Sequence, residues 1–324
     1  MRREATLVLA ALISACGAAS PTTDAGPDAG VSALSDAGTL GDAGTLVGTF
    51  QLLHLVTLPV GSASLVGKVY DGPSPQSLVW EVDTKDGDCE LQTPRVPFCA
   101  TPCGGSAVCV ENDTCQAYAA SKPVGTVHVS GVLTTPVSTF DMSPIVNGYQ
   151  PPASVTLAVP PFADAAPVTL VADGSASVIP FTLTSSGVAP FALTSTGLTL
   201  ISGSPLELTW APGSTSTAAR IKVKLDISHH GGTRGQVLCD TDDDGALSLS
   251  GALVTKLINL GVAGFPTIVV RRQKVGSTLV AAGRVELLVG SELEQAVGIP
   301  GLTSCTADTD CTPPQTCQTD LRCQ

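Results

Sequence analysis

The sequence predicts a mainly β protein: an antiparallel β-sandwich with one short helix, plus small disulfide-rich modules. The 324 residues include few aromatic residues (4%) and few charged residues (14%), but 33 glycines and 24 prolines. That composition is typical of β proteins with many turns. Short apolar runs also recur between Gly- and Pro-bearing turns at the spacing of sandwich strands. The net charge of −12 argues against binding to nucleic acid or to an anionic lipid surface, because both need clustered Lys and Arg.

The N-terminus has the parts of an export signal. Two arginines precede an apolar run at 5–13, which is too short to span a bilayer and is followed by Ser14-Ala15-Cys16. Residues 13–16 resemble the lipobox of bacterial lipoproteins. This resemblance implies cleavage before Cys16, acylation of its thiol, and a membrane anchor at the outer membrane or cell surface. The alternative is an ordinary signal peptide, in which Cys16 is removed or incidental.

The next segment predicts a tether. Residues 16–45 contain the tripeptide Asp-Ala-Gly four times, and their low apolar bulk leaves the entropy cost of ordering unopposed. We therefore divide the chain into a lipoprotein signal peptide (1–15), a flexible Asp-Ala-Gly-rich tether (16–45), a short-strand region with a cysteine-rich module (46–122), a β-sandwich domain (123–298) and a C-terminal cysteine-rich module (299–324).

The strands are predicted from alternating or continuous apolar runs bounded by turn residues. In the first folded region they lie at 50–53, 66–69 and 78–82. In the sandwich they lie at 127–132, 155–159, 168–171, 179–183, 198–201, 206–210, 221–227, 236–239, 267–271 and 284–289. The exception is a short amphipathic helix over 250–260, with Ser250 as its N-cap. Trp210 is expected in the core or at an interface.

The cysteines predict disulfides. The chain has 11 cysteines, and lipidation of Cys16 would leave an even number that can all pair in an oxidising compartment. Each of two quartets can close on itself, and this leaves Cys89 to pair with Cys239. Four cysteines allow three pairings, so the pairing within a quartet stays open. The quartets are Cys99, Cys103, Cys109 and Cys115, and Cys305, Cys311, Cys317 and Cys323.

Zinc is the alternative use of these quartets. Neither quartet contains a histidine, and the spacing is not that of a zinc ribbon, so disulfides are favoured. Residues 304–323 resemble the small Dickkopf-like cysteine modules of secreted proteins. Such a module has too few residues for a core and depends on its disulfides for stability.

One acidic loop is the candidate metal site. Asp240, Asp242, Asp244 and Gly245 match positions 1, 3, 5 and 6 of a calcium-binding loop of the EF-hand or dockerin type, where alternate carboxylates converge on one cation. Position twelve is Gly251 where a glutamate is expected, so any affinity would be weak. The alternative is an acidic turn that faces solvent. Calcium is the one cofactor that the sequence suggests.

Two adjacent histidines offer the candidate catalytic chemistry. His229 and His230 lie close in sequence to Asp226, so a metal pair or a general base is conceivable there. Adjacent strand residues point to opposite faces, which favours a structural role near a turn. No nucleophile elbow, phosphate loop or dinucleotide motif is present in the sequence. We therefore do not expect an enzyme.

The function is expected at the cell envelope. Residues 67–72, 97–99 and 228–232, with the cysteine-rich tail, resemble a group of hypothetical myxobacterial lipoproteins, a resemblance that implies a location but no known activity. We expect a lipid-anchored protein with a non-enzymatic binding or structural role, whose partner is a surface protein or a glycan. The alternatives are a calcium-dependent adhesion, carbohydrate-binding or protein-binding module, and a hydrolase that uses Asp226 with His229 or His230.

Overall fold

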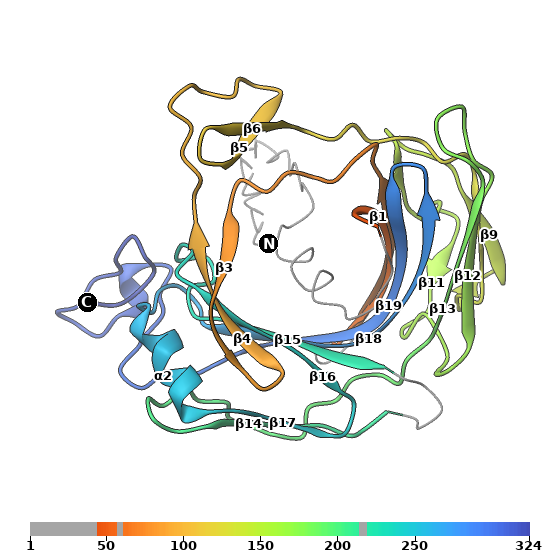
Figure 1. Ribbon diagram of the computed structural model, residues 1–324. Coiled ribbons are helices and arrows are strands. Elements are labelled where there is room, and N and C mark those ends of the chain that lie inside the picture. Colours follow the sequence, from red (N-terminus) through yellow and green to blue (C-terminus); the bar gives the residue numbers. More distant parts are fainter. Residues whose placement is uncertain (1–43, 57–60, 214–218) are drawn as a thin grey trace, which may run out of the picture.

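The computed structural model describes residues 44–56, 61–213 and 219–324 (Figure 1). The predicted signal peptide, the predicted lipidation site Cys16 and residues 16–43 of the predicted tether lie outside the described residues. Within the described residues no helix has the length and apolar character needed to cross a bilayer.

The fold is mainly β, as predicted, and is built on one nine-stranded sheet. Its order is β10-β2-β1-β19-β18-β15-β16-β4-β3, and every pair is antiparallel except the parallel pair β1–β19. Figure 1 shows that this sheet is strongly curved and therefore has a concave and a convex face. The strands are β1 (Leu46–Leu55), β2 (Ser62–Val69), β3 (Val79–Asp86), β4 (Cys89–Arg95), β10 (Gly148–Tyr149), β15 (Arg220–Asp226), β16 (Gln236–Asp242), β18 (Thr267–Val280) and β19 (Gly283–Ala296).

A four-stranded sheet covers one half of the convex face and makes the sandwich. Its order is β13-β12-β7-β9, with β7 (Val127–Ser130), β9 (Thr139–Met142), β12 (Pro167–Ala172) and β13 (Phe181–Ser186). Alternate residues of both sheets meet in one core, including Phe50 and Leu287 from the large sheet and Val129 and Leu170 from the small one. Gly276 lets β18 approach β13 closely, because a Cβ there would lie 1.8 Å from the Thr184 carbonyl oxygen.

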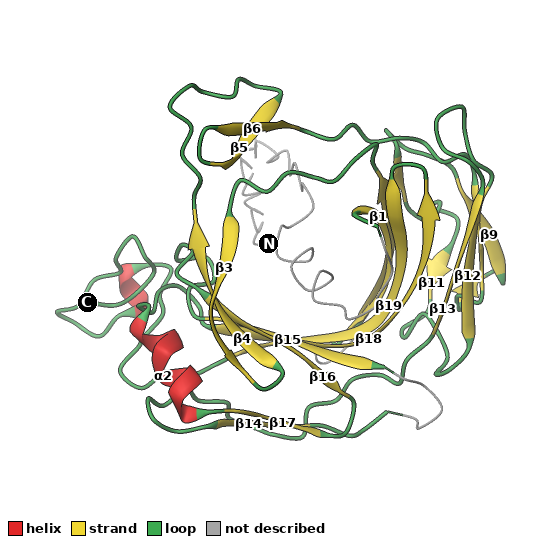
Figure 2. Cartoon of the chain, viewed as in Figure 1, coloured by secondary structure: helices red, strands yellow, loops and turns green. Residues whose placement is uncertain are grey.

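A second core lies under the other half of the convex face. The strand pair β14 (Leu206–Thr209) and β17 (Ala246–Leu249) and the helix α2 (Gly251–Asn259) cover it. This helix is the one α-helix in the described part of the chain (Figure 2). It begins at the predicted residue, because the Ser250 hydroxyl accepts a hydrogen bond from the Leu253 amide at 3.2 Å. Trp210 is buried in this core, as expected. A short pair, β8 (Thr134–Thr135) and β11 (Thr156–Leu157), completes the sheets.

Two small cysteine-rich modules flank the large sheet. The first contains the hairpin of β5 (Ala107–Glu111) and β6 (Thr114–Ala117), and the second contains the 3-10 helix η1 (Asp308–Asp310). In both, the first cysteine pairs with the third and the second with the fourth. The pairs are Cys99–Cys109 and Cys103–Cys115, and Cys305–Cys317 and Cys311–Cys323.

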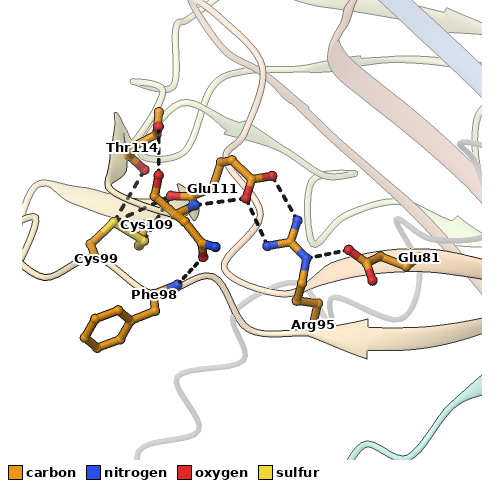
Figure 3. A network of polar contacts seen from close by, with 8 residues as sticks. Glu81, Arg95, Phe98, Cys99, Cys109, Glu111 and Thr114 are labelled. Carbon is orange, nitrogen blue, oxygen red and sulfur yellow. Dashed lines mark hydrogen bonds and ion pairs between the residues drawn. A yellow bond between two sulfur atoms is a disulfide. The ribbon is translucent and has the colours of Figure 1, made fainter.

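Side-chain contacts fix the first module to the end of the large sheet. The guanidinium of Arg95 in β4 donates to both carboxylate oxygens of Glu111 in β5, at 3.1 and 2.9 Å, and also to Glu81 in β3 (Figure 3). The Phe98 amide donates to the Asn112 side chain at 3.1 Å. The second module is held at Gly264, whose amide donates to the carbonyl oxygen of Asp320 at 2.7 Å and whose carbonyl oxygen accepts from the Ser304 hydroxyl at 2.6 Å.

The sheets do not follow the domain boundaries expected from the sequence. The predicted boundary at 122/123 does not separate two sheets, because β1–β4 lie in the same sheet as β15, β16, β18 and β19. Residues 198–201 form no strand and make one isolated bridge, from Thr199 to Gly298. Of residues 155–159, two are in a strand, β11. The strand expected at 267–271 continues to Val280.

Candidate ligand-binding face

The concave face of the large sheet carries the candidate site. In β15, Ile221, Val223 and Leu225 lie in the second core, under the layers that cover the convex side. Side chains alternate along a strand, so Lys222 and Lys224 project to the other side. We define the concave face by residues that project in this way from the four central strands: Arg220, Lys222 and Lys224 in β15, Asp240 and Asp242 in β16, Val269, Arg271 and Gln273 in β18, and Glu286, Gly290 and Glu292 in β19.

The first group of charges on this face joins β15 to β16. The register places Lys222 beside Asp240 and Arg220 beside Asp242. The Lys222 ammonium lies 2.5 Å from one Asp240 oxygen, and Arg220 donates through Nε to the other at 2.9 Å and also contacts Asp242. The Lys222 side chain is 2% exposed. Burial lowers the pKa of Lys222, and the neighbouring Asp240 carboxylate opposes that shift.

The second group joins β18 to β19. Arg271 and Glu292 are register partners, and the Arg271 Nε donates to a Glu292 oxygen at 2.7 Å. The aliphatic part of Arg271 runs over Gly290, where a Cβ would lie 3.2 Å from the Arg271 Cδ. Glycine at 290 therefore leaves the room that this side chain needs. Farther along β19, Arg284 and Glu286 form an ion pair at 2.9 Å.

Two polar atoms that β18 contributes to this face have no hydrogen-bond partner among the described residues. They are Nη1 of Arg271, whose residue is 0% exposed, and Oε1 of Gln273, whose residue is 3% exposed. A buried donor or acceptor without a partner costs about 1–3 kcal/mol, so native proteins rarely retain one without a reason. Both atoms come from one strand and one face, two residues apart. They form a donor and an acceptor that a bound molecule could satisfy.

The three carboxylates of the predicted calcium loop do not converge in the structure. Asp240 and Asp242 lie in β16, where they bind Arg220 and Lys222, while the Asp244 carboxylate accepts a hydrogen bond from the Ala246 amide at 3.3 Å. The only groups of three or more potential metal ligands within the described ranges are cysteine sulfurs. The three aspartates do not converge because the strand continues through Asp242 and because two basic side chains already neutralise its carboxylates.

Asp243, which lies between Asp242 and Asp244, points away from the concave face. Asp243 lies on the side of the second core, where it accepts hydrogen bonds from the Trp210 ring at 2.8 Å and from the Gly213 amide at 3.0 Å. It also pairs with the buried Arg272, at 2.7 Å from Nε. The acidic run is therefore divided between the concave face, the core and the turn.

The two histidines and Asp226 are not assembled as a catalytic pair. Asp226 accepts hydrogen bonds from the Ser228 amide at 2.8 Å and from its hydroxyl at 3.2 Å, which closes a turn. The rings of His229 and His230 lie against each other with centroids 3.9 Å apart. The Nε2 of His229 faces Glu294 at 4.0 Å. Both histidines lie in the turn that follows β15.

The cysteines are used as disulfides. Cys89 in β4 bonds to Cys239 in β16, its register partner, as elimination from the two quartets predicted. Sulfurs of Cys99, Cys103 and Cys115, and of Cys305, Cys311 and Cys323, lie close enough to share a metal, but the same sulfurs are bonded in pairs. The zinc alternative therefore has no free thiolates in these modules.

Sequence reasoning missed the central residues of this face. Arg271 ended a predicted strand and Gln273 lay beyond it, so neither was assigned to a site. Arg271 and Arg272 are adjacent and take opposite faces, one beside Glu292 and the other beside Asp243. Alternation predicts that the two differ, but it does not say which one faces the core.

Comparisons with known proteins add little to this geometry. No protein-family model matches the chain, and no curated protein matches it. Among solved structures, the FN1–FN3 domains of chicken CNTN1 align with 73% of this chain and 78% of that chain, at 8% sequence identity and a TM-score of 0.19. That TM-score is too low to carry over a fold or a function.

Proposed function

We propose that this chain is a non-enzymatic binding protein of the cell envelope, and that its ligand binds on the concave face. The observation that carries the proposal is the pair of buried polar atoms, Arg271 Nη1 and Gln273 Oε1, that have no partner among the described residues. A ligand that supplies an acceptor and a donor there would remove the cost of leaving both unsatisfied.

The surroundings support a preorganised binding surface. Cross-strand ion pairs hold Arg271 and Lys222 in place, and the disulfide Cys89–Cys239 joins β4 to β16 at the side of the same sheet. Two cores support the convex side. Side chains that are held before the ligand arrives lose little entropy on binding.

The envelope location rests on the lipobox-like segment at 13–16 and on the disulfides, which suit an oxidising compartment. The mature protein would begin at Cys16 and carry a lipid there. Metabolic labelling with a fatty acid tests this: the wild-type chain should incorporate the label and stay with the membrane, and Cys16→Ala should do neither. Unchanged labelling in the variant would exclude Cys16 as the anchor.

The binding face is tested by photocrosslinking in intact cells. A benzophenone amino acid is placed at Lys224 on the concave face and, as a matched control, at Lys256 on α2, whose side chain is 52% exposed on another surface. We expect an adduct at position 224, identified by mass spectrometry, and none at position 256. Adducts at 256 but not at 224 would place the binding surface elsewhere on the molecule.

A further inference from the structure

We infer that the concave face binds an extended, uncharged polypeptide segment, whose backbone hydrogen bonds to Arg271 and Gln273. The inference rests on the proposed function and names the class of ligand that the face takes. Three properties of the face lead to it: the charges around Arg271 and Lys222 are paired, the two unsatisfied atoms of β18 are one donor and one acceptor, and the central strands contain no aromatic residue.

The ion pairs around Arg271 and Lys222 favour a ligand without net charge. Arg271 is neutralised by Glu292, Lys222 by Asp240, and Arg220 by Asp240 and Asp242. Next to Arg271 and Gln273, a charged ligand would lose its hydration without gaining an opposite charge that is not already engaged in these pairs. A neutral polar ligand has no such penalty.

The chemistry of the two unsatisfied atoms sets the functional group. Arg271 Nη1 can only donate a hydrogen bond, whereas Gln273 Oε1 can only accept one. The two residues are two positions apart on an antiparallel strand, which puts their Cα atoms roughly 6.8 Å apart. A residue in an extended peptide presents its N–H and its C=O on the same side, as each hydrogen-bonded residue of an antiparallel ladder does. One such residue could satisfy both atoms, with its carbonyl on Arg271 and its amide on Gln273.

The composition of the central strands favours a peptide over a sugar. β15, β16, β18 and β19 contain no Phe, Tyr or Trp, so this part of the face offers no aromatic ring on which a sugar could stack. It does offer an apolar position at Val269, which is half-buried and shares the face of Arg271 by alternation. Such a position can receive a side chain of an extended peptide while polar groups bind its backbone.

The experiment measures binding to the full chain by isothermal titration calorimetry. The probes are the end-blocked pentapeptide Ac-Thr-Val-Thr-Val-Thr-NH2, the same peptide with lysine or aspartate at its centre, and the neutral sugar cellopentaose. The variants are Arg271→Lys, which keeps a positive charge beside Glu292 but lacks Nη1, and Gln273→Met, which leaves every ion pair intact. Lys256→Met on α2 is the matched control.

We expect the neutral peptide to bind the wild type and the control equally. Each variant should weaken its binding by about threefold to tenfold, the value of one hydrogen bond, and both charged peptides should bind more weakly than the neutral one. Thermal melting of each variant establishes that it is folded. The Gln273→Met variant keeps the test decisive if Arg271→Lys does not fold.

Two outcomes separate this inference from the function on which it rests. If a crosslinked adduct forms at position 224 but cellopentaose binds and the peptide does not, the face is a binding surface and the class of ligand is wrong. If the peptide binds wild type and both variants equally, Arg271 and Gln273 do not hold it and the inference is overturned. If no adduct forms at 224 and neither probe binds, the proposed function itself fails.

Discussion

Replacing Asp243 with alanine removes the counter-charge of a guanidinium inside the second core. The Arg272 side chain is 2% exposed and that of Asp243 is 8% exposed. Their two hydrogen bonds measure 2.7 Å from Nε and 2.9 Å from Nη2. Arg272 also donates to backbone carbonyls, at 3.1 Å to Ala189, 3.2 Å to Pro190 and 2.6 Å to Ala211. These carbonyls carry no net charge, so they cannot replace the carboxylate.

The expected loss of stability follows from this burial. Removing one partner of a buried ion pair leaves an uncompensated charge and costs about 3–5 kcal/mol. The same carboxylate also accepts from the Trp210 ring and the Gly213 amide, and an orphaned donor costs about 1–3 kcal/mol. Because these losses share one cavity they do not add fully. We therefore expect Asp243→Ala to lower the free energy of unfolding by about 3–5 kcal/mol.

The neighbouring residue supplies the control. The side chain of Asp242 is 81% exposed and pairs with Arg220 at the surface, so Asp242→Ala should cost at most about 1 kcal/mol. Both variants are unfolded in urea with the disulfides intact, and the unfolding is followed by tryptophan fluorescence and circular dichroism. Equal losses in the two variants, or a loss below about 1 kcal/mol for Asp243→Ala, would refute the assignment of a buried ion pair.

Three further predictions concern other parts of the molecule. Hydrogen bonds that His128 donates to Asp141, and to a lesser extent to Asp173, raise the pKa of His128. A raised pKa stabilises the fold below the unfolded value of about 6.5, and this stabilisation is lost as pH rises through the folded value. The melting temperature of His128→Gln should therefore fall below that of the wild type at mildly acidic pH and approach it at alkaline pH, and a constant difference would contradict this. Ser250→Ala should lower the free energy of unfolding by about 1 kcal/mol in urea titrations, more than Ser250→Thr. Millimolar calcium should leave the melting temperature unchanged, because Asp240 is already paired. A clear rise in the melting temperature would instead support calcium binding by Asp240, Asp242 and Asp244.

Local patterns predicted the elements that depend on local chemistry. The alternation at 221–227 is β15, and Ser250 caps α2 where the sequence placed it. Disulfide pairing of Cys89 with Cys239 followed from parity. These features succeed because a side-chain period, a cap and a cysteine count are each set within a short stretch or by simple counting.

Pairing between distant strands was not predictable in the same way. The period of β1 shows which residues are buried but not that its partner is β19, or that the two are parallel. The predicted strand ended at residue 271, whereas β18 continues through Gly276, which makes room for Thr184. The spacing of the aspartates suggested a calcium loop. Their stretch of sequence does not show that Arg220 and Lys222 on the neighbouring strand neutralise Asp240. Such partners are defined by the sheet, not by the stretch of sequence itself.

The interleaved strand order has a consequence for the making of this protein. The centre of the large sheet, β15 to β19, comes from the last third of the chain, whereas β1 to β4 are synthesised first and end up at its two sides. During synthesis, one edge of β1 stays unpaired until β19 has followed and one edge of β4 until β16 has followed, and Cys89 waits for a partner 150 residues later. Contacts of such long sequence separation make folding slow and expose edges to aggregation. In that interval Cys89 could pair wrongly with a cysteine of the first module, so correct maturation would depend on disulfide exchange before the sheet closes.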